Sequence, residues 1–245
     1  MLSHPFPALT PDQMSHVDRL MADALGVETL QLMELAGQAV AAWARQRFLG
    51  DARGRRVIVL AGRGGNGGDG LVAARLLHAW GALPAVWLSH ALDRLGEDAA
   101  HQARSLTALG LPLHLPSAAD AIALPPADLL IDALLGFGLR GPPAGPAARL
   151  IEAANAHAAP TLAVDLPSGL DALTGEPHAP CVRAAATLTL ALPKTGLLAP
   201  AARPFVGELA VADIGIPPEI YARVGVEVGP LFAQRSIVRV ESREP

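Results

Sequence analysis

Apolar and polar positions along the chain fall into two alternating patterns. Short apolar runs such as Val57-Ile58-Val59-Leu60 contain no polar position, which is typical of strands buried on both faces of a sheet. Between such runs, apolar residues recur at helical spacing. Strands are predicted at 57–60, 85–88, 128–131, 161–165, 187–191 and 208–212, and helices at 70–80, 96–109, 117–123 and 144–157. This alternation predicts a Rossmann-like three-layer α/β/α sandwich with a mostly parallel sheet.

Two further helices are predicted before the first strand. Thr10 can cap a helix that carries Gln13 three positions later, the spacing of a capping box, and Gly26 ends it. The second helix is expected at 28–48. At the other end of the sheet, 187–191 and 208–212 have no long helix between them, so they are expected to add a mixed or antiparallel edge.

The length of 245 residues suits one large α/β domain, which we predict at 1–218, with 219–245 as a docking tail or linker remnant. A formal charge of −4 gives no electrostatic support for binding nucleic acid. No signal peptide or membrane-spanning run is predicted. One cysteine, Cys181, fits a reducing compartment, and the expected location is cytoplasmic.

The stretch AGRGGNGGDG, residues 61–70, follows the first strand and holds six glycines in ten positions. Bare backbone beside a helix N-terminus suits a phosphate or pyrophosphate, and the alternative is a tight turn that needs positive φ angles. A standard dinucleotide fold would place an acid near the end of the second strand, but 87–90 reads Trp-Leu-Ser-His. Asn66 and Asp69 exceed what a phosphate cradle requires, so we expect Asp69 to bind ribose hydroxyls or the loop itself.

Two more apolar strands end in acids. Asp132 precedes a glycine-rich loop, and Asp165 precedes Pro167-Ser168-Gly169. A nucleophile elbow is disfavoured at Ser168 because the first glycine of Gly-x-Ser-x-Gly is absent. Oxygens of Asn66, Asp132 and Ser168 would instead suit a hard monovalent or divalent cation. Asp171 is interpreted as a capping or turn residue.

Four ordered motifs resemble those of the YjeF N-terminal domain family. They are Leu32-Met33-Glu34-Leu35-Ala36-Gly37, the glycine stretch 62–70, Asp132 to Leu139, and Asp165 to Asp171, followed by Pro193-Lys194-Thr195-Gly196. The resemblance covers about residues 10–217. It implies NAD(P)HX epimerase activity, the interconversion of the R and S forms of hydrated NADH and NADPH (NADHX and NADPHX) for repair by a partner dehydratase. It also implies a homodimer that binds one potassium ion per subunit.

The resemblance implies a role for particular residues of this chain. The potassium ligands would be Asn66, Asp132 and Ser168, and Asp165 would be catalytic, with Lys194 as a helper or a solvated surface residue. The substrate would contact Gly65, Asn66, Gly67, Gly68, Asp69, Gly136, Phe137, Gly138, Leu139, Arg140, Gly141, Pro142 and Asp165. Gly65 departs from the family pattern, which has asparagine there, so a weakened substrate contact is expected.

Two other interpretations stay open at this stage. A non-catalytic nucleotide-binding or dimerisation scaffold of the same fold could lose the acids and the glycine stretch, but this chain keeps them. An NAD-dependent oxidoreductase would be expected to carry the acid that 87–90 lacks.

Overall fold

The computed structural model describes residues 6–116 and 122–240. Its strands are β1 (Arg56–Ala61), β2 (Leu83–Leu88), β3 (Leu113–His114), β4 (Leu129–Ala133), β5 (Thr161–Val164), β6 (Ala186–Leu190), β7 (Glu208–Ala212) and β8 (Ile237–Arg239). In these ranges they form one sheet of order β3-β2-β1-β4-β5-β6-β7-β8. All pairs are parallel except β7 with β8. The α/β fold with a mostly parallel sheet is therefore confirmed.

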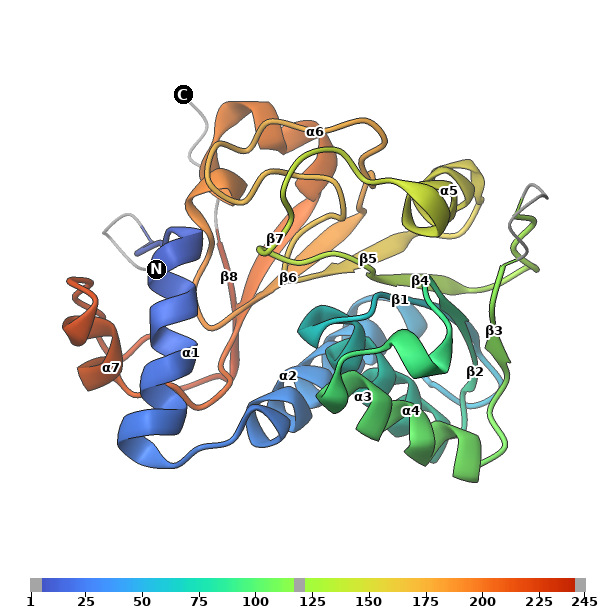
Figure 1. Ribbon diagram of the computed structural model, residues 1–245, viewed down its shortest axis with the longest axis horizontal. Coiled ribbons are helices and arrows are strands. Elements are labelled where there is room, and N and C mark those ends of the chain that lie inside the picture. The colour runs from blue at the N-terminus through green and yellow to red at the C-terminus, as the bar shows by residue number, and fades with distance from the viewer. Residues whose placement is uncertain (1–5, 117–121, 241–245) are drawn as a thin grey trace.

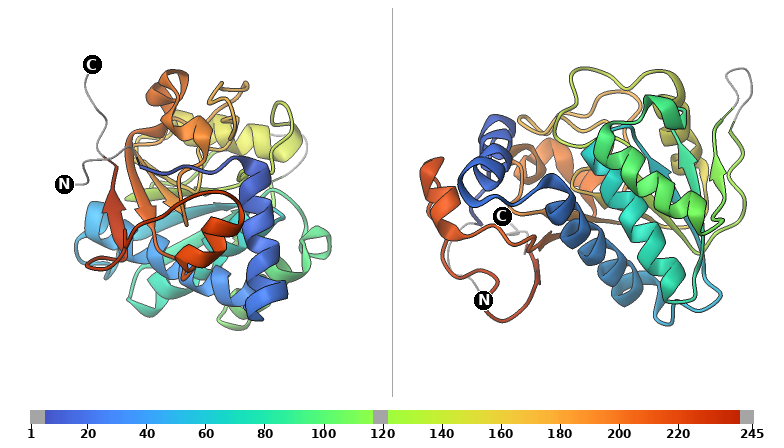
Figure 2. Two further views of the ribbon diagram at one scale, coloured as in Figure 1. Left: turned by 90° about the vertical axis from the view of Figure 1, so that its left-hand side faces the viewer. Right: turned by 60° about the horizontal axis from the view of Figure 1, so that its bottom comes forward.

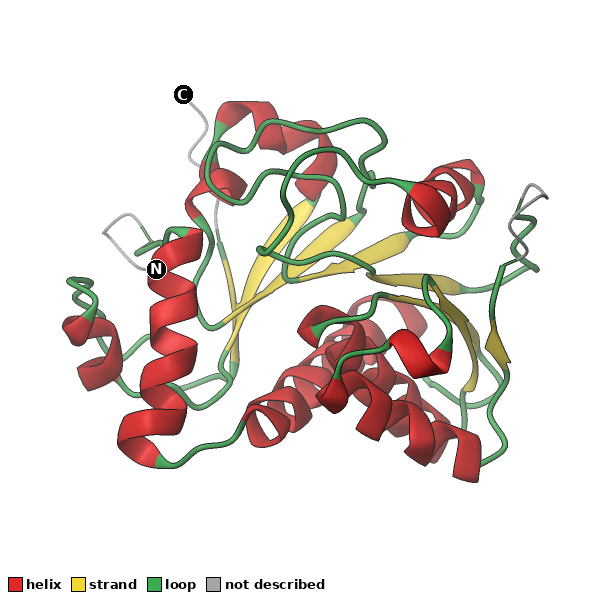
Figure 3. Ribbon diagram, in the orientation of Figure 1, coloured by secondary structure: helices red, strands yellow, loops and turns green. Residues whose placement is uncertain are grey.

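Helices cover both faces of this sheet (Figures 1 and 3). The α-helices are α1 (Pro11–Leu25), α2 (Thr29–Ala44), α3 (Gly65–Ala79), α4 (Glu97–Ala108), α5 (Gly145–Ala156), α6 (Arg203–Val206) and α7 (Pro218–Arg223). Short helical turns of other types are η1 (Arg45–Leu49), η2 (Leu92–Arg94), η3 (Thr195–Leu198) and η4 (Pro200–Ala202). Helices α2, α3 and α4 lie on one face, while α5 and α6 lie on the other (Figure 1).

Strand β1 shows why the apolar runs are uninterrupted. Val57 and Val59 belong to the core under α2, α3 and α4, whereas Ile58 and Leu60 belong to the core under α5. Because successive side chains of a strand point to opposite faces, a strand between two helical layers needs apolar residues at every position. All four side chains are almost fully buried.

The N-terminal helix has the ends that the sequence predicts. Thr10 Oγ1 accepts from Gln13 N at 3.2 Å, and Gln13 Oε1 accepts from Thr10 N at 2.9 Å. Gly26 ends the helix in the left-handed region, at φ 66°. Just before the helix, Leu9 exchanges backbone hydrogen bonds with Pro193 and Thr195, so the start of α1 is joined directly to the segment that carries Lys194.

The residues after 218 add to the same core within the described ranges. Ile220 and Tyr221 of α7 are buried in the main core, and Val224 O accepts from Gln13 Nε2 of α1 at 3.1 Å. Figure 2 shows α7 beside α1. Strand β8 pairs antiparallel with β7. The boundary at 218 and a link from there to another domain stay predictions, but 219–240 does not hang free of the domain.

The sequence prediction is wrong at several elements. The strands at 187–191 and 208–212 pair in parallel, so the antiparallel alternative for this pair is wrong, whereas the edge is mixed because β8, which is not predicted, pairs antiparallel with β7. The second helix changes to π-helical geometry at η1. Most of the helix expected at 117–123 lies outside the described residues, and 122–123 is not helical.

The largest difference concerns the glycine stretch. Helix α3 begins at Gly65 rather than near residue 70, so most of the expected loop is the first turns of a helix. None of its glycines has a positive φ. A Cβ on Gly62 would lie 1.8 Å from Leu134 O, and one on Gly67 would lie 2.0 Å from Gly62 O. Bare backbone is required at these positions for close approach, not for an unusual turn.

Candidate functional site

The site lies where three neighbouring parallel strands end. Strands β1, β4 and β5 are adjacent in the sheet, so Asn66 and Asp69, Asp132, and Asp165 follow the same edge. Carboxyl ends of parallel strands are where open α/β sheets bind ligands. The structure therefore brings the predicted acids to one edge of one sheet.

Asp165 and Lys194 form a buried ion pair at this edge. Lys194 Nζ donates to Asp165 Oδ1 and, at 3.0 Å, to Leu190 O. The same Oδ1 accepts from Thr189 Oγ1 at 3.1 Å and from Leu190 N at 3.2 Å. Lys194 is only 1% exposed and Asp165 4%, so the alternative of Lys194 as a solvated surface residue is excluded.

The backbone around this pair is strained. Asp165 and Ala191 are the non-glycine residues of the described ranges with positive φ, at 65° and 67°. Left-handed backbone costs a residue with a Cβ about 1 kcal/mol or more, and such positions cluster at functional sites. Both follow directly after strands, β5 and β6, so strain accompanies the turn that places the Asp165 carboxylate beside Lys194.

Asp69 lies close enough to this pair to interact electrostatically with it. Its side chain is buried on α3, and none of the residues in 6–116 and 122–240 gives its carboxyl a hydrogen bond. Burial, and next the negative charge of Asp165, raise the pKa of Asp69 well above the usual carboxyl range, while Lys194 opposes this. The buried position of Asp69 beside this ion pair therefore favours the neutral form of its carboxyl.

Asp18 of α1 belongs to the same group of charges, and sequence reasoning missed it. Its surroundings raise its pKa to about 6, mainly through desolvation, with Lys194 lowering the pKa and Asp165 raising it. The side chain still reaches solvent. Asp18 is exposed but lies four residues after Met14 and three before Met21, both buried, so helical spacing places it beside the buried face of α1. That spacing is the sequence signal by which Asp18 could have been identified.

Asp132 and Ser168 meet directly. Ser168 Oγ donates to Asp132 Oδ1 at 2.6 Å, and Ser168 N donates to Oδ2 at 2.8 Å. Both residues are fully buried. Burial raises the pKa of Asp132 to about 6, although the hydrogen bonds from Ser168 and Leu134 oppose the rise. Ser168 Oγ bonds to this carboxyl and to the Leu135 backbone, an arrangement that does not activate a nucleophile.

The third predicted cation ligand, Asn66, lies beside the loop that follows β4. A Cβ on Gly136 would be 3.3 Å from Asn66 Cβ. The Asn66 Nδ2 atom is buried, and no acceptor in the described residues pairs with it. Around this point, the amide of Asn66, the Asp132 carboxylate, the Ser168 hydroxyl and the Leu135 carbonyl offer oxygen atoms, which are the ligands that hard cations prefer. The donor chemistry fits a potassium ion, and among the described residues no His, Cys, Asp and Glu cluster offers a different metal centre.

The loop 136–142 reaches the ion pair through one residue. Lys194 Nζ lies 5.7 Å from the centre of the Phe137 ring, which also packs on two hydrophobic clusters. The outer part of the loop is different, because Gly138, Arg140 and Pro142 are exposed, and Leu139 N closes a turn on Gly136 O. Thus Phe137 and Gly136 join the site in this structure, while the residues beyond them lie at its margin.

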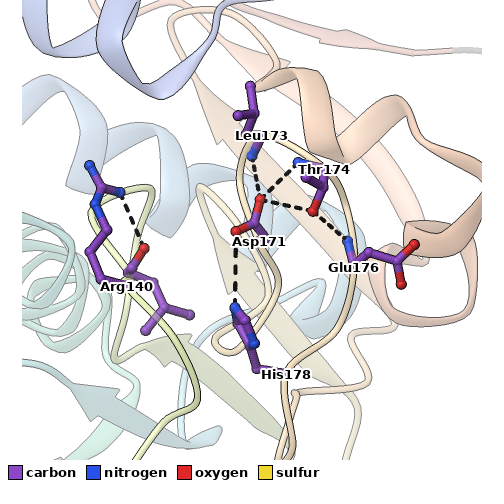
Figure 4. Close-up of polar contacts among 7 residues, drawn as sticks. Arg140, Asp171, Leu173, Thr174, Glu176 and His178 are labelled. Atoms are coloured by element: carbon purple, nitrogen blue, oxygen red, sulfur yellow. Dashed lines mark hydrogen bonds and ion pairs between the residues drawn. The ribbon is translucent and has the colours of Figure 1, made fainter.

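Figure 4 shows that Arg140 and Asp171 have local partners. Arg140 Nη1 donates to Leu139 O at 3.2 Å. Asp171 Oδ1 accepts from Leu173 N at 2.9 Å and from Thr174 N at 2.8 Å, and these bonds, led by Thr174, lower the pKa of Asp171. The interpretation of Asp171 as a turn residue is confirmed.

At the start of α3 the backbone is open. No atom lies within 4 Å of a Cβ built on Gly64 or on Gly65, and both residues are exposed. Glycine in place of asparagine at position 65 therefore leaves open space and breaks no contact within the protein. Its N–H belongs to the first turn of α3, which intrahelical bonds leave free for an anion.

A cavity of about 380 Å³ lies away from these acids, at the ends of β2 and β3. It is lined by Leu88, Ala91, Leu92, Asp93, Leu113 and Leu115. It contains none of the predicted site residues. In the described part of the chain, no helix combines the length and the apolar character that crossing a bilayer requires.

Known proteins resemble this chain in sequence and in fold. The family described as YjeF-related protein N-terminus matches residues 29–196. The chain is 43% identical to a bifunctional NAD(P)H-hydrate repair enzyme, Nnr, of Pyrobaculum aerophilum, over 89% of this chain and 44% of that protein. It is 40% identical to an NAD(P)H-hydrate epimerase of Dehalogenimonas lykanthroporepellens, over 89% and 86%. The crystal structure of the yeast protein ynu0 superposes with a TM-score of 0.79 at 26% identity, over 95% and 99%.

Proposed function

The chain belongs to the family of the YjeF-related protein N-terminus, and on that premise we propose that it is an NAD(P)H-hydrate epimerase. The observation that carries the proposal is Asp69, whose pKa burial raises, beside the buried Asp165–Lys194 ion pair at the strand edge next to the glycine stretch. A second epimerase relative, from Rhodopirellula baltica, is 35% identical over 90% of this chain and 89% of its own length. The assay that tests the proposal follows the interconversion of R and S NADHX by chromatography.

The proposed chemistry uses one proton shared by two carboxyls. The substrate carries a hydroxyl on the ring carbon next to nitrogen. Asp69 protonates that hydroxyl, the C–O bond breaks, and the nitrogen lone pair gives an iminium cation, which the Asp165 carboxylate stabilises. Water then attacks the other face of the carbon and loses a proton to Asp165. The reverse reaction uses the same groups with their protonation exchanged, so no net proton is consumed.

Lys194 has a positioning role in this scheme. Its ammonium group holds the Asp165 carboxylate in one orientation through the buried ion pair. The Phe137 ring lies near the ammonium and limits its access to water. Lys194 therefore fixes the Asp165 carboxylate beside Asp69, although its positive charge opposes the rise in the pKa of Asp69.

Asp69→Asn tests the proton donor. Asp69 must be protonated to act as the proton donor, so wild-type turnover should fall as the pH rises through its raised pKa. The variant should lose about a hundredfold in kcat, and its kcat should no longer fall at alkaline pH. Stability should move the opposite way. A carboxyl with a raised folded pKa destabilises the fold as pH increases above the unfolded value, so the neutral amide should give a higher Tm than wild type at pH 8.

Equal kcat for wild type and Asp69→Asn across the pH range would contradict the assignment. Asp18→Asn is the matched comparison, because its pKa is also raised and it shares the neighbours Lys194 and Asp165, but it lies on another helix and reaches solvent. If Asp18 acts only through its charge, its substitution should shift the pH profile of turnover. The kcat at the pH optimum should then change by less than about tenfold, which corresponds to about 1.4 kcal/mol of activation free energy.

We also propose that potassium binds at Asn66, Asp132 and Ser168, one ion per subunit, and orients the loops after β1, β4 and β5. Support comes from the oxygen atoms of these residues, from the contact of Ser168 with Asp132, and from the position of Asn66 beside Gly136. A bound cation would supply positive charge to a carboxylate that burial otherwise makes costly.

Exchange of potassium for choline at constant ionic strength should lower turnover about tenfold or more and lower Tm, since the ion stabilises the folded state that binds it. Ser168→Ala should increase the potassium concentration needed for half-maximal rate. Turnover and Tm that are identical in potassium and in choline would exclude the ion.

The remaining partners are proposals of the same kind. The chain spans less than half the length of the bifunctional relatives it matches. A separate or fused NAD(P)HX dehydratase is therefore the proposed functional partner, and a homodimer and a cytoplasmic location stay predictions. The non-catalytic scaffold is disfavoured because Asp69, Asp165 and Lys194 form a coupled buried group, which costs stability and would not be needed for a scaffold.

A further inference from the structure

A basic cluster lies beside the glycine stretch, and the proposed chemistry does not use it. Arg63 lies inside the stretch, and His90 and Arg94 lie in the segment that follows β2. Backbone bonds hold the two segments together: Ser89 N donates to Ala61 O at 3.0 Å, and Gly96 N donates to Arg63 O at 2.8 Å. The cluster therefore bridges the carboxyl ends of β1 and β2.

The charges in this cluster lack counterions. Arg63 and Arg94 are exposed, and neither forms an ion pair with any residue in 6–116 or 122–240. Both are close enough to His90 to help lower its pKa, although desolvation is the larger cause. Ser89 is buried, and its Oγ lies 2.9 Å from His90 Nδ1. The neighbouring acid, Asp93, lines the apolar cavity at the ends of β2 and β3.

The position of the cluster in the fold indicates its ligand. In a doubly wound sheet, the pyrophosphate of a dinucleotide lies at the loop after the first strand, and its adenosine ribose reaches the end of the second strand. An acid there binds a free 2′-hydroxyl, whereas arginine accommodates a 2′-phosphate. This chain has Ser89 and His90 at that point, with Arg63 and Arg94 around them.

We propose that Arg63, Arg94 and Ser89 bind the 2′-phosphate of the adenosine ribose, so that the enzyme favours NADPHX over NADHX. The choice between NADPHX and NADHX rests on the proposed function, whereas the phosphate site itself does not. Two guanidinium groups supply charge-assisted donors to a dianionic phosphate, and the Ser89 hydroxyl supplies a neutral donor when His90 Nδ1 carries the proton of their hydrogen bond. His90 holds the serine and contributes little charge, because its lowered pKa leaves it neutral at pH 7.

Calorimetric titration with adenosine 2′,5′-bisphosphate and with adenosine 5′-monophosphate tests the site without turnover. Wild type should bind the bisphosphate at least about tenfold more tightly, since a hydrogen bond to a charged group contributes about that factor or more. Arg63→Gln and Arg94→Gln should each remove most of this difference while leaving the monophosphate unchanged. Arg223→Gln on α7 is the control, because it removes an exposed arginine near the opposite edge of the sheet and should change neither affinity (Figure 1).

Steady-state kinetics gives the second readout. The ratio of kcat/KM for NADPHX to that for NADHX should be about ten or more in wild type and near one in Arg63→Gln/Arg94→Gln, with the loss falling on NADPHX. The inference is overturned if wild type binds both nucleotides equally, or if the arginine variants weaken both equally, which would place the pyrophosphate at the cluster. If neither substrate is epimerised but the binding difference depends on the arginines, the proposed function fails and the phosphate site stands.

Discussion

We expect Asp165→Asn to abolish epimerisation while nucleotide binding survives. The substitution keeps the shape of the side chain but removes the carboxylate that stabilises the iminium cation and takes the proton from water. Loss of a general base costs about a hundredfold to ten-thousandfold, and loss of the stabilising charge adds to it. We therefore expect kcat to fall by at least about a thousandfold. Single-turnover assays of R-to-S NADHX conversion, with nucleotide affinity measured in parallel, check this result.

The buried lysine requires a control in this experiment. Asp165→Asn leaves the Lys194 ammonium without its counter-charge in a buried position, and one unpaired member of a buried ion pair costs about 3–5 kcal/mol. The double variant Asp165→Asn/Lys194→Met removes both charges and should recover much of that stability without recovering activity. Asp171→Asn, in an exposed turn of the same segment, should keep near-wild-type turnover. Turnover of Asp165→Asn within about tenfold of wild type, in folded protein, would disprove the assignment.

Residue types at strand ends could be predicted well from the sequence. Uninterrupted apolar runs ending in Asp132 and Asp165 specify both the strands and the positions of the acids, because parallel neighbours end at one edge. What the sequence could not supply is long-range pairing. Lys194 follows Asp165 by 29 residues, and only the parallel packing of β5 against β6 makes the ion pair. The electrostatic coupling of Asp18 to this ion pair likewise depends on the packing of α1 beside it.

Local propensity failed where tertiary packing decides the backbone. Glycine is a poor helix former, so a stretch with six glycines reads as a loop, yet α3 begins within it. The helix forms there because its first turns pack against Gly62, Met33 and Ala133 with no room for a Cβ. Likewise, the short strand β8 has little pattern of its own and depends on the edge of β7.

Gly62→Ala should destabilise the fold strongly. The added Cβ would lie 1.8 Å from Leu134 O and 2.8 Å from Leu134 C, which are backbone atoms that no rotamer change can move. Gly62 N is also bonded to Ala133 O at 2.9 Å, so relief requires β1 and the segment after β4 to separate. Overpacking of this kind costs about 3 kcal/mol or more. For a domain of this size, that lowers Tm by about 6–12 °C, measured by calorimetry.

Gly65→Ala is the matched control, three residues away in the same stretch. No atom lies within 4 Å of its added Cβ, and Gly65 is already helical. Alanine should therefore leave the free energy of unfolding unchanged or increase it by about 0.5–1 kcal/mol. The contrast separates two roles that the sequence alone presents as one. If both variants lose stability equally, the glycines act through a shared loop conformation. If only Gly62→Ala loses stability, Gly62 is required for the close packing that positions α3. Gly64 and Gly65 are then not needed for packing, and their exposed backbone is available to the nucleotide.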